Sequence, residues 1–166
     1  PGAPSAPASP ASPAASQSEL VTDPRGDATN PALDLVSASW GVTGADLTVT
    51  VAVAGAAQID GFHMYIDADS DASTGYSTAN ILGAERMVEG AIIYTHAGAA
   101  QTDWNWTAGP AATYEFTGSA LTLTIPLASL GLASGQPVKV SFGFTDASWS
   151  PADWMPDGQP VTTAVP

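Results

Sequence analysis

The chain has 166 residues, enough for one domain with a single buried core, and it contains no cysteine, which excludes disulfides, thiolate metal sites and a cysteine nucleophile. Its formal net charge is −13, because 16 Asp and Glu residues stand against three Lys and Arg. An acidic chain without a basic patch does not suit nucleic acid, and no apolar run reaches the roughly 20 residues of a membrane-spanning helix, so we expect neither nucleic acid binding nor membrane insertion.

The first 18 residues are of low complexity, made of Pro, Gly, Ala and Ser with one Gln. Proline recurs there every three residues, which matches the turn of a polyproline II helix and would place the rings along one edge. We predict a stiff tail or linker over residues 1–18, followed by a folded domain over residues 19–166. A second interpretation is that this edge docks on another copy of the chain through Pro1, Pro4, Pro7, Pro10 and Pro13.

From residue 33 onward, apolar and polar residues alternate with a period of two, and Gly, Asp or Asn interrupt the pattern at short intervals. In the first of these segments Leu33, Leu35, Ser37 and Ser39 are expected to face one way. A short helical turn is expected at residues 126–131, between a proline and a glycine. About ten short strands without a long helix predict an all-β, two-sheet antiparallel β-sandwich of jelly-roll type. The predicted strands cover residues 33–39, 47–53, 62–67, 85–88, 91–96, 104–107, 114–117, 121–125, 138–144 and 161–165.

Asp67, Asp69 and Asp71 alternate in the loop that follows the third predicted strand. Carboxylates at alternate positions of a turning loop converge on one point, and a cation such as calcium lets three of them coexist there. The match to a helix-flanked calcium loop is incomplete, because Ala72 stands where such a loop has glycine. We predict a structural calcium site in this loop, with a solvated acidic turn as the alternative.

A second acidic group, Asp23 and Asp27, precedes the first predicted strand. One interpretation adds these two residues to the metal ligands. The other is a plain turn, rich in Pro and Gly, in which Arg25 pairs with an aspartate.

Four tryptophans are candidates for a ligand surface. Trp104 and Trp106 are two residues apart, which on a strand places both rings on one face. Trp149 and Trp154 lie in a late segment rich in Ser, Pro and Asp. Exposed aromatic rings beside polar side chains suit a sugar, which presents apolar ring faces and many hydroxyl groups. Packing in the core is the competing explanation for all four.

Catalysis finds little support in the sequence. His63 and His96 are the only histidines and both fall inside predicted strands, and no serine lies in a recognisable nucleophile turn. Glu85 and Glu89 share a face if they belong to one strand, but a glycosidase pair also needs a defined carboxyl separation and a raised pKa on one member. We therefore predict a protein that is not an enzyme.

Several segments, in order along residues 21–166, resemble DOMON-like and family 9 carbohydrate-binding-module-like β-sandwich domains of secreted bacterial proteins. They include Asp23-Pro-Arg-Gly-Asp27, Phe62-His-Met-Tyr-Ile-Asp67, Gly83-Ala-Glu-Arg-Met-Val-Glu-Gly90 and Ile125-Pro-Leu-Ala-Ser-Leu-Gly131. The resemblance implies an extracellular sandwich, often with calcium, that binds sugar or serves as an accessory module. It implies metal ligation by Asp23, Asp27, Asp67 and Asp69, and it places Arg86 on the ligand face, where many relatives have an aromatic residue.

The first functional hypothesis is thus a secreted, non-catalytic carbohydrate-binding accessory module with structural calcium and a polysaccharide or other glycan as its partner. Its ligand residues are Trp104, Trp106, Arg86, Trp149 and Trp154. The alternative is a self-assembling structural subunit of an extracellular filament or surface layer, in which the proline-rich tail docks on a neighbouring subunit.

Overall fold

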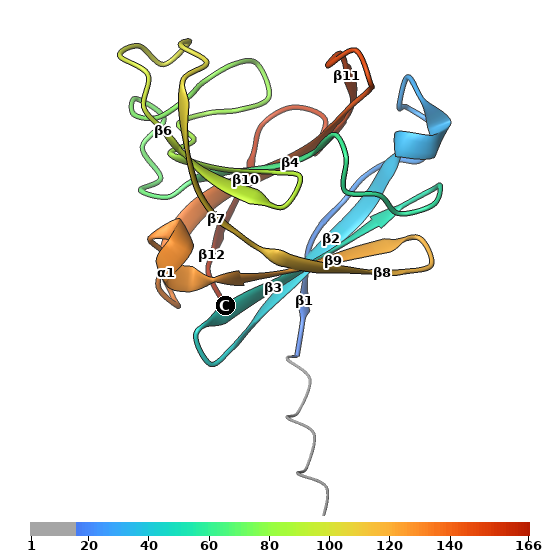
Figure 1. The fold of residues 1–166 in the computed structure, drawn as a ribbon, viewed down its shortest axis with the longest axis horizontal. Helices are drawn as coiled ribbons and strands as arrows, with labels where there is room; N and C mark the ends of the chain where they lie inside the picture. The colour runs from blue at the N-terminus through green and yellow to red at the C-terminus, as the bar shows by residue number, and fades with distance from the viewer. Residues whose placement is uncertain (1–15) are drawn as a thin grey trace, which may run out of the picture.

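Two antiparallel sheets pack face to face in the computed structural model, which describes residues 16–166 (Figure 1). The predicted β-sandwich is confirmed, with twelve strands in place of ten. The two additional strands are β1 (Ser18–Thr22) and β11 (Pro151–Met155). The prolines predicted to form a docking edge, Pro1, Pro4, Pro7, Pro10 and Pro13, lie outside the described residues.

The first sheet has five strands in the order β1-β2-β3-β9-β8. After β1 the chain forms a short 3-10 turn, η1 (Pro31–Leu33), and then enters the sheet again. The remaining strands are β2 (Leu35–Thr43), β3 (Asp46–Val53), β8 (Thr113–Thr117) and β9 (Ala120–Pro126). The predicted helical turn is present after β9 as α1 (Leu127–Leu130), which ends at Gly131 with a left-handed φ of 68°.

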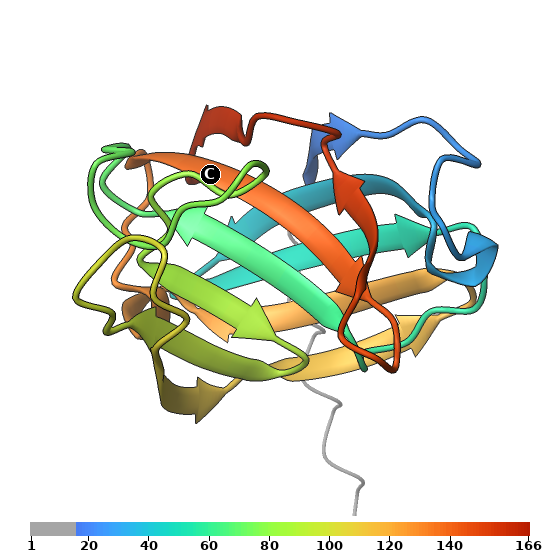
Figure 2. The same cartoon turned by 90° about the horizontal axis from the view of Figure 1, so that it is seen from above.

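The second sheet has seven strands, and six of them run in the order β11-β10-β4-β5-β6-β7. The last strand, β12 (Val161–Ala164), pairs with β10 along the stretch that β11 leaves free. β10 and β4 lie side by side through the middle of this sheet (Figure 2). The other strands are β4 (Phe62–Asp67), β5 (Arg86–Glu89), β6 (Ile92–His96), β7 (Trp106–Ala111) and β10 (Pro137–Thr145).

The main core lies between the two sheets and follows the two-residue alternation of the sequence. Alternate residues of β3 and β10 are fully buried there, from Leu47 to Val53 and from Val138 to Phe144. The expectation for β2 was wrong after Leu35. A bulge between Leu35 and Ser37 adds one residue to the strand, so that Ala38 and Trp40 face the core in place of Ser37 and Ser39.

β4 is buried on both of its faces, and this positions the candidate site. Phe62, Met64 and Ile66 belong to the main core, whereas His63 and Tyr65 point to the outer side of the seven-stranded sheet. The segment between β4 and β5 covers part of that side, where Ile81 and Ala84 pack on Tyr65 and Met87.

Among the described residues, the structure contains no helix that could span a membrane.

Candidate functional site

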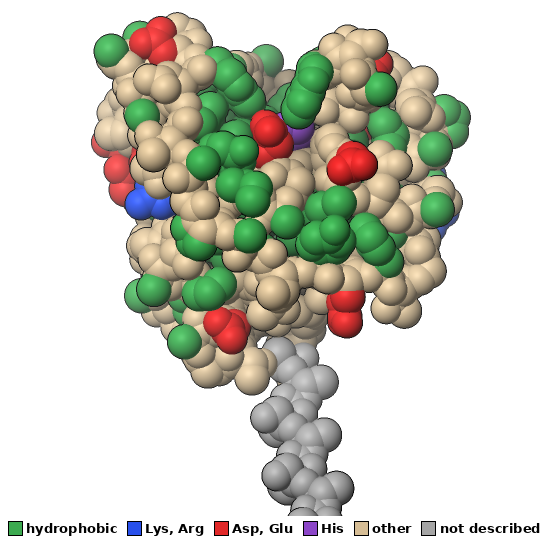
Figure 3. Space-filling model, viewed as in Figure 1, with side chains coloured by type: hydrophobic (Ala, Val, Ile, Leu, Met, Phe, Trp, Pro, Cys, Tyr) green, Lys and Arg blue, Asp and Glu red, His purple; other side chains and the backbone are tan. Residues whose placement is uncertain are grey.

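A pocket of about 750 Å³ opens on the outer side of the seven-stranded sheet. Its volume falls within the range of roughly 300–1,000 Å³ that is typical of small-molecule sites. Aromatic rings form much of its lining: His63 and Tyr65 are buried, Trp154 is half-buried, and Trp104 and Trp149 are exposed. Figure 3 shows a hollow on this face of the molecule, with an acidic and a histidine side chain inside it and apolar side chains around it.

Strand geometry organises the buried part of the pocket. His63 and Tyr65 are two residues apart on β4, so their rings stand on the same side, parallel to within 2° and with centroids 5.7 Å apart. The Trp154 ring lies 5.9 Å from the Tyr65 ring. It comes from β11 and packs against Gly143 of β10. A Cβ atom added to Gly143 would lie only 3.0 Å from the indole, so the ring needs a residue without a side chain at this position.

Trp104 lies in the loop before β7 and is 54% exposed. Its ring contacts Tyr76 edge-on, with centroids 5.2 Å apart and an interplanar angle of 80°. Trp106 packs behind it at 5.7 Å and does not line the pocket. An exposed indole that two other aromatic rings hold in place is preorganised to stack on a flat apolar ligand surface.

Trp149 is the most exposed aromatic residue of the pocket, at 66%. Its backbone adopts a φ of 63°, which is uncommon for a bulky residue with a Cβ atom. Asp146 maintains this turn, because its carboxylate accepts hydrogen bonds from the backbone N–H groups of Ser148 and Ser150 at 2.8 and 3.0 Å. Residues in such backbone conformations cluster at functional sites, which makes Trp149 a candidate for ligand contact.

The polar centre of the pocket is the pair His63 and Glu89. His63 Nδ1 lies 3.0 Å from the Gly61 carbonyl oxygen, which can only accept, so Nδ1 carries a proton. His63 Nε2 lies 3.2 Å from Glu89 Oε2, and a bond there requires one further proton shared by the pair. Burial lowers the pKa of His63, and the neighbouring Glu89 opposes this shift. The pair therefore places a proton and a carboxylate against the space that a ligand would fill.

The structure brings together only part of the predicted ligand set. Trp104, Trp149 and Trp154 line one pocket, although they are far apart in sequence, and Trp106 supports Trp104. Arg86 lies elsewhere, because its Nε donates to the Leu130 carbonyl oxygen at 3.0 Å, at the end of α1. Sequence reasoning missed Tyr65, Tyr76, His63 and Glu89 as pocket residues. The alternation in residues 62–67 did place His63 and Tyr65 on one face, but it could not show that this face borders a pocket.

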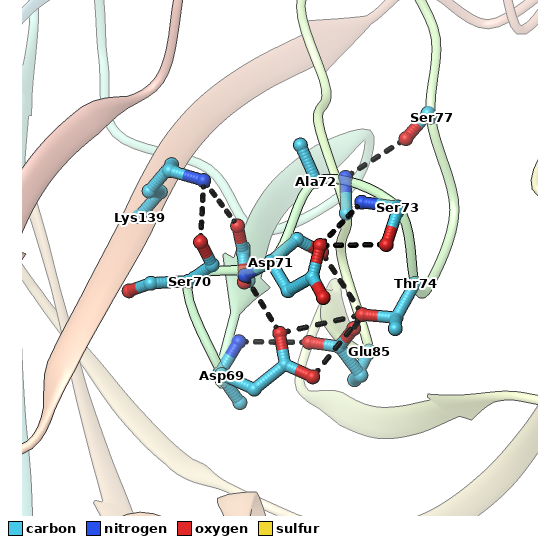
Figure 4. A network of polar contacts seen from close by, with 12 residues as sticks. Asp69, Ser70, Asp71, Ala72, Ser73, Thr74, Ser77, Glu85 and Lys139 are labelled. Carbon is cyan, nitrogen blue, oxygen red and sulfur yellow. Dashed lines mark hydrogen bonds and ion pairs between the residues drawn. The ribbon is translucent and has the colours of Figure 1, made fainter.

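The loop predicted to bind calcium is held together largely by protein groups. Oxygen atoms of Asp67, Asp69 and Glu85 lie within 4.8 Å of one another. Lys139 binds one Asp67 oxygen at 2.9 Å, and the Thr74 hydroxyl donates to Glu85 at 2.6 Å (Figure 4). Asp67 Oδ1 is buried without a hydrogen-bond partner. A cation at this position would share Asp67 with a lysine, so calcium binding here stays a prediction.

Asp71, the third aspartate of the predicted calcium loop, does not belong to that cluster. Its carboxylate turns back on its own loop, where Oδ1 accepts from the Ser73 hydroxyl at 2.7 Å and from the Ser73 N–H at 2.9 Å. These two bonds lower the pKa of Asp71. The side chain thus acts as a turn-forming aspartate within the described structure.

The second predicted acidic group, Asp23 and Asp27, includes a third aspartate in the structure. Asp23 and Asp27 are joined by Asp153 of β11, and one carboxylate oxygen of each lies within 4.8 Å of the others. Asp23 and Asp153 are buried and Asp27 is exposed. The alternative interpretation, in which Arg25 pairs with an aspartate, has no such ion pair among the described residues.

Comparison with protein-family models found no match, and comparison with curated proteins found none either. The resemblance to DOMON-like and family 9 carbohydrate-binding-module-like domains therefore stays a prediction from the sequence.

Proposed function

We propose that the aromatic pocket binds a carbohydrate and that the chain is a non-catalytic binding module of an extracellular protein. The observation that supports this most is the pairing of two exposed indoles, Trp104 and Trp149, with the polar pair His63 and Glu89 in one pocket. A sugar ring offers apolar C–H faces to the indoles and hydroxyl groups to the carboxylate and the imidazole.

The polar lining favours binding over hydrolysis. Glu89 is the one carboxylate among the described residues that line the pocket. Hydrolysis of a glycoside normally uses two carboxyl groups that flank the scissile bond. His63 is engaged by Gly61 and Glu89, which suits a role in fixing the orientation of the carboxylate.

A neighbouring hollow of about 690 Å³ supports a ligand longer than one sugar. The two hollows share Thr145, Glu89 and Trp149, so Trp149 stands between them. Tyr114 borders the second hollow and is 46% exposed. An oligosaccharide that stacks on Trp149 could place sugar units in both hollows, and its affinity would then rise with chain length.

Calorimetric titration with neutral and amine-bearing oligosaccharides of increasing length tests this proposal, since a net charge of −13 disfavours anionic glycans. We expect Trp104→Ala and Trp149→Ala to weaken binding at least tenfold, about 1.4 kcal/mol. Phe116→Ala is the matched control for the first pocket, because Phe116 is also exposed, at 47%, and lines neither hollow, although its ring contacts Tyr114 beside the second one. Folded wild-type protein that binds none of these glycans would refute the proposal, as would tryptophan variants with unchanged affinity.

The alternative hypothesis, self-assembly through the proline-rich tail, depends on residues outside the described part of the chain. It stays a prediction. Light scattering of the full chain and of a variant that lacks residues 1–18 tests it, because a docking tail is needed for assembly and its removal should leave glycan binding unchanged.

A further inference from the structure

Five aspartates gather where the segment after β1 meets β11. Carboxylate oxygens of Asp23, Asp27 and Asp153 lie within 4.8 Å of one another, and Asp34 and Asp157 are close enough to raise the pKa of Asp23. Three of the five, Asp23, Asp34 and Asp153, are buried. Such a concentration of negative charge is relieved either by protonation of some of the carboxylates or by a bound cation.

The chain offers no such charge from its Lys and Arg side chains. All three of them belong to the described residues: Lys139 binds Asp67, and Arg86 binds the Leu130 and Glu85 carbonyl oxygens. Arg25 lies in the same turn as Asp23 and Asp27, yet within the described structure it makes no ion pair with either.

A second observation is independent of the clustering. Asp23 is only 9% exposed, and its Oδ2 atom is buried without a hydrogen-bond partner. Oδ1 of Asp34, which is 3% exposed, is in the same situation. Buried carboxylate oxygens that no donor reaches are rare, because their desolvation is left uncompensated. They point to a ligand that supplies positive charge at this place.

Asp153 supplies a fixed ligand, because both of its carboxylate oxygens have hydrogen-bond partners, whereas Asp23 Oδ2 and Asp34 Oδ1 have none. Its Oδ2 accepts from the Leu35 N–H at 2.6 Å and its Oδ1 from the Trp154 N–H at 2.9 Å. These bonds set the orientation of the carboxylate and leave each oxygen with a further lone pair. An anchored carboxylate from β11 therefore faces two carboxylates from the segment that follows β1.

We propose that a calcium ion binds between Asp23, Asp27 and Asp153. The candidate ligands are all carboxylate oxygens, which is the preference of a hard divalent cation, and neither His nor Cys belongs to the described group. The Asp67 cluster also has a buried oxygen without a partner, Asp67 Oδ1, but there Lys139 already supplies a positive charge to the same carboxylate.

The ion would connect the N-terminal part of the domain to the pocket. Asp153 directly precedes Trp154, which lines the pocket, and Thr29 already donates to the Ala152 carbonyl oxygen at 2.9 Å. Calcium would add a second link between the segment after β1 and β11. It would thereby hold β11 and its tryptophan in place, whatever ligand the pocket binds.

Thermal unfolding in calcium and in the chelator EGTA tests the proposal on the full chain. We expect calcium at a hundredfold excess over its Kd to raise the Tm by roughly 5–10 °C. Asp23→Asn should lower the calcium affinity at least tenfold. In EGTA the same variant should melt at or above the wild-type temperature, because one repelling charge is gone. Asp27→Asn, at an exposed position that does not endanger folding, should lose the calcium response in the same way.

Two control variants locate the ion. Asp46→Asn removes an exposed charge at the start of β3 and should keep the full response, and Asp69→Asn should keep it although it alters the other acidic cluster. Terbium provides a second readout, because Trp154 next to Asp153 can sensitise its luminescence. This emission should disappear in Asp27→Asn and persist in Asp69→Asn.

Three results would overturn the proposal. The first is a Tm that does not respond to millimolar calcium. The second is a response that persists in Asp23→Asn and Asp27→Asn but is lost in Asp69→Asn. The third is an equal rise in sodium chloride of the same ionic strength, which would mean that screening alone relieves the repulsion.

Discussion

Lys139 and Asp67 face each other across β10 and β4, and the Lys139 ammonium lies 2.9 Å from Asp67 Oδ2. The carboxylate is almost completely buried, whereas the lysine side chain is 21% exposed. Burial raises the pKa of Asp67, and the hydrogen bond and charge of Lys139 oppose that rise. The same ammonium donates to the Ser70 carbonyl oxygen at 3.0 Å, so one residue fixes both the end of β4 and the acidic loop.

Lys139→Met should destabilise the fold by roughly 3 kcal/mol at neutral pH, because it leaves a buried carboxylate without a counter-charge. Urea unfolding followed by tryptophan fluorescence measures the change. The double variant Lys139→Met/Asp67→Asn removes both charges and should recover most of the loss. A double variant no more stable than the single one would mean that the lysine acts by packing and not by charge.

Phe62→Ala should reduce the free energy of unfolding by about 3–5 kcal/mol, as expected for a fully buried aromatic residue. Phe62 lies 5.6 Å from the Phe144 ring and 6.4 Å from the Phe142 ring, so its removal leaves a cavity between β4 and β10. Phe116→Ala is the control on the exposed strand β8 and should change stability by about 0.5 kcal/mol or less. Similar losses in both variants would contradict the assignment of the core.

Gly143→Ala should weaken glycan binding while the fold is retained. Its new Cβ atom would stand 3.0 Å from Trp154 Cζ3, so the indole that lines the pocket must shift. We expect a stability cost of about 1–3 kcal/mol and a larger relative loss of affinity. Ser141→Ala, two residues earlier on the same strand, removes a buried hydroxyl that lacks a hydrogen-bond partner and should leave both properties unchanged. Unchanged binding by Gly143→Ala would exclude a role for the Trp154 position.

The aspartates around Asp23 should make the protein less stable as the pH rises, when no divalent cation is present. Burial and neighbouring acids raise the pKa of Asp23 from 3.8 to about 7, and burial raises that of Asp153 to about 6. Between these values and 3.8 the folded state binds more protons than the unfolded state. The free energy of unfolding therefore falls as the pH increases from about 4 to about 7, and this contribution is constant above that.

Urea unfolding in EGTA across this pH range measures the effect. His63 acts in the opposite direction, since its lowered pKa removes stability as the pH falls below 6.5. The difference between the wild type and Asp23→Asn isolates the contribution of the aspartate, and this difference should shrink when calcium is added. A wild-type protein that gains stability relative to Asp23→Asn as the pH rises in EGTA would contradict the prediction.

The parts of the fold that were predicted correctly are those in which local pattern and burial agree. The alternation in residues 47–53 and 138–144 was confirmed because each segment has one face in the main core. The prediction for β2 was wrong because a bulge between Leu35 and Ser37 shifts the alternation, and a bulge has no clear sequence signal. β1 and β11 were missed because they are short edge strands, rich in polar residues or containing proline, and only their pairing with β2 and β10 defines them.

The sequence by itself determined the class of fold, the absence of a basic surface and the kinds of side chain available for binding, because these depend on composition and on a two-residue period. Only the tertiary structure decided which of those side chains meet. Trp104, Trp149 and Trp154 reach one pocket, and Asp153 joins Asp23 and Asp27, through strand pairings between segments distant in the chain. Such pairings are selected by the burial of whole sheet faces and by the register between strands, which no local stretch of sequence encodes.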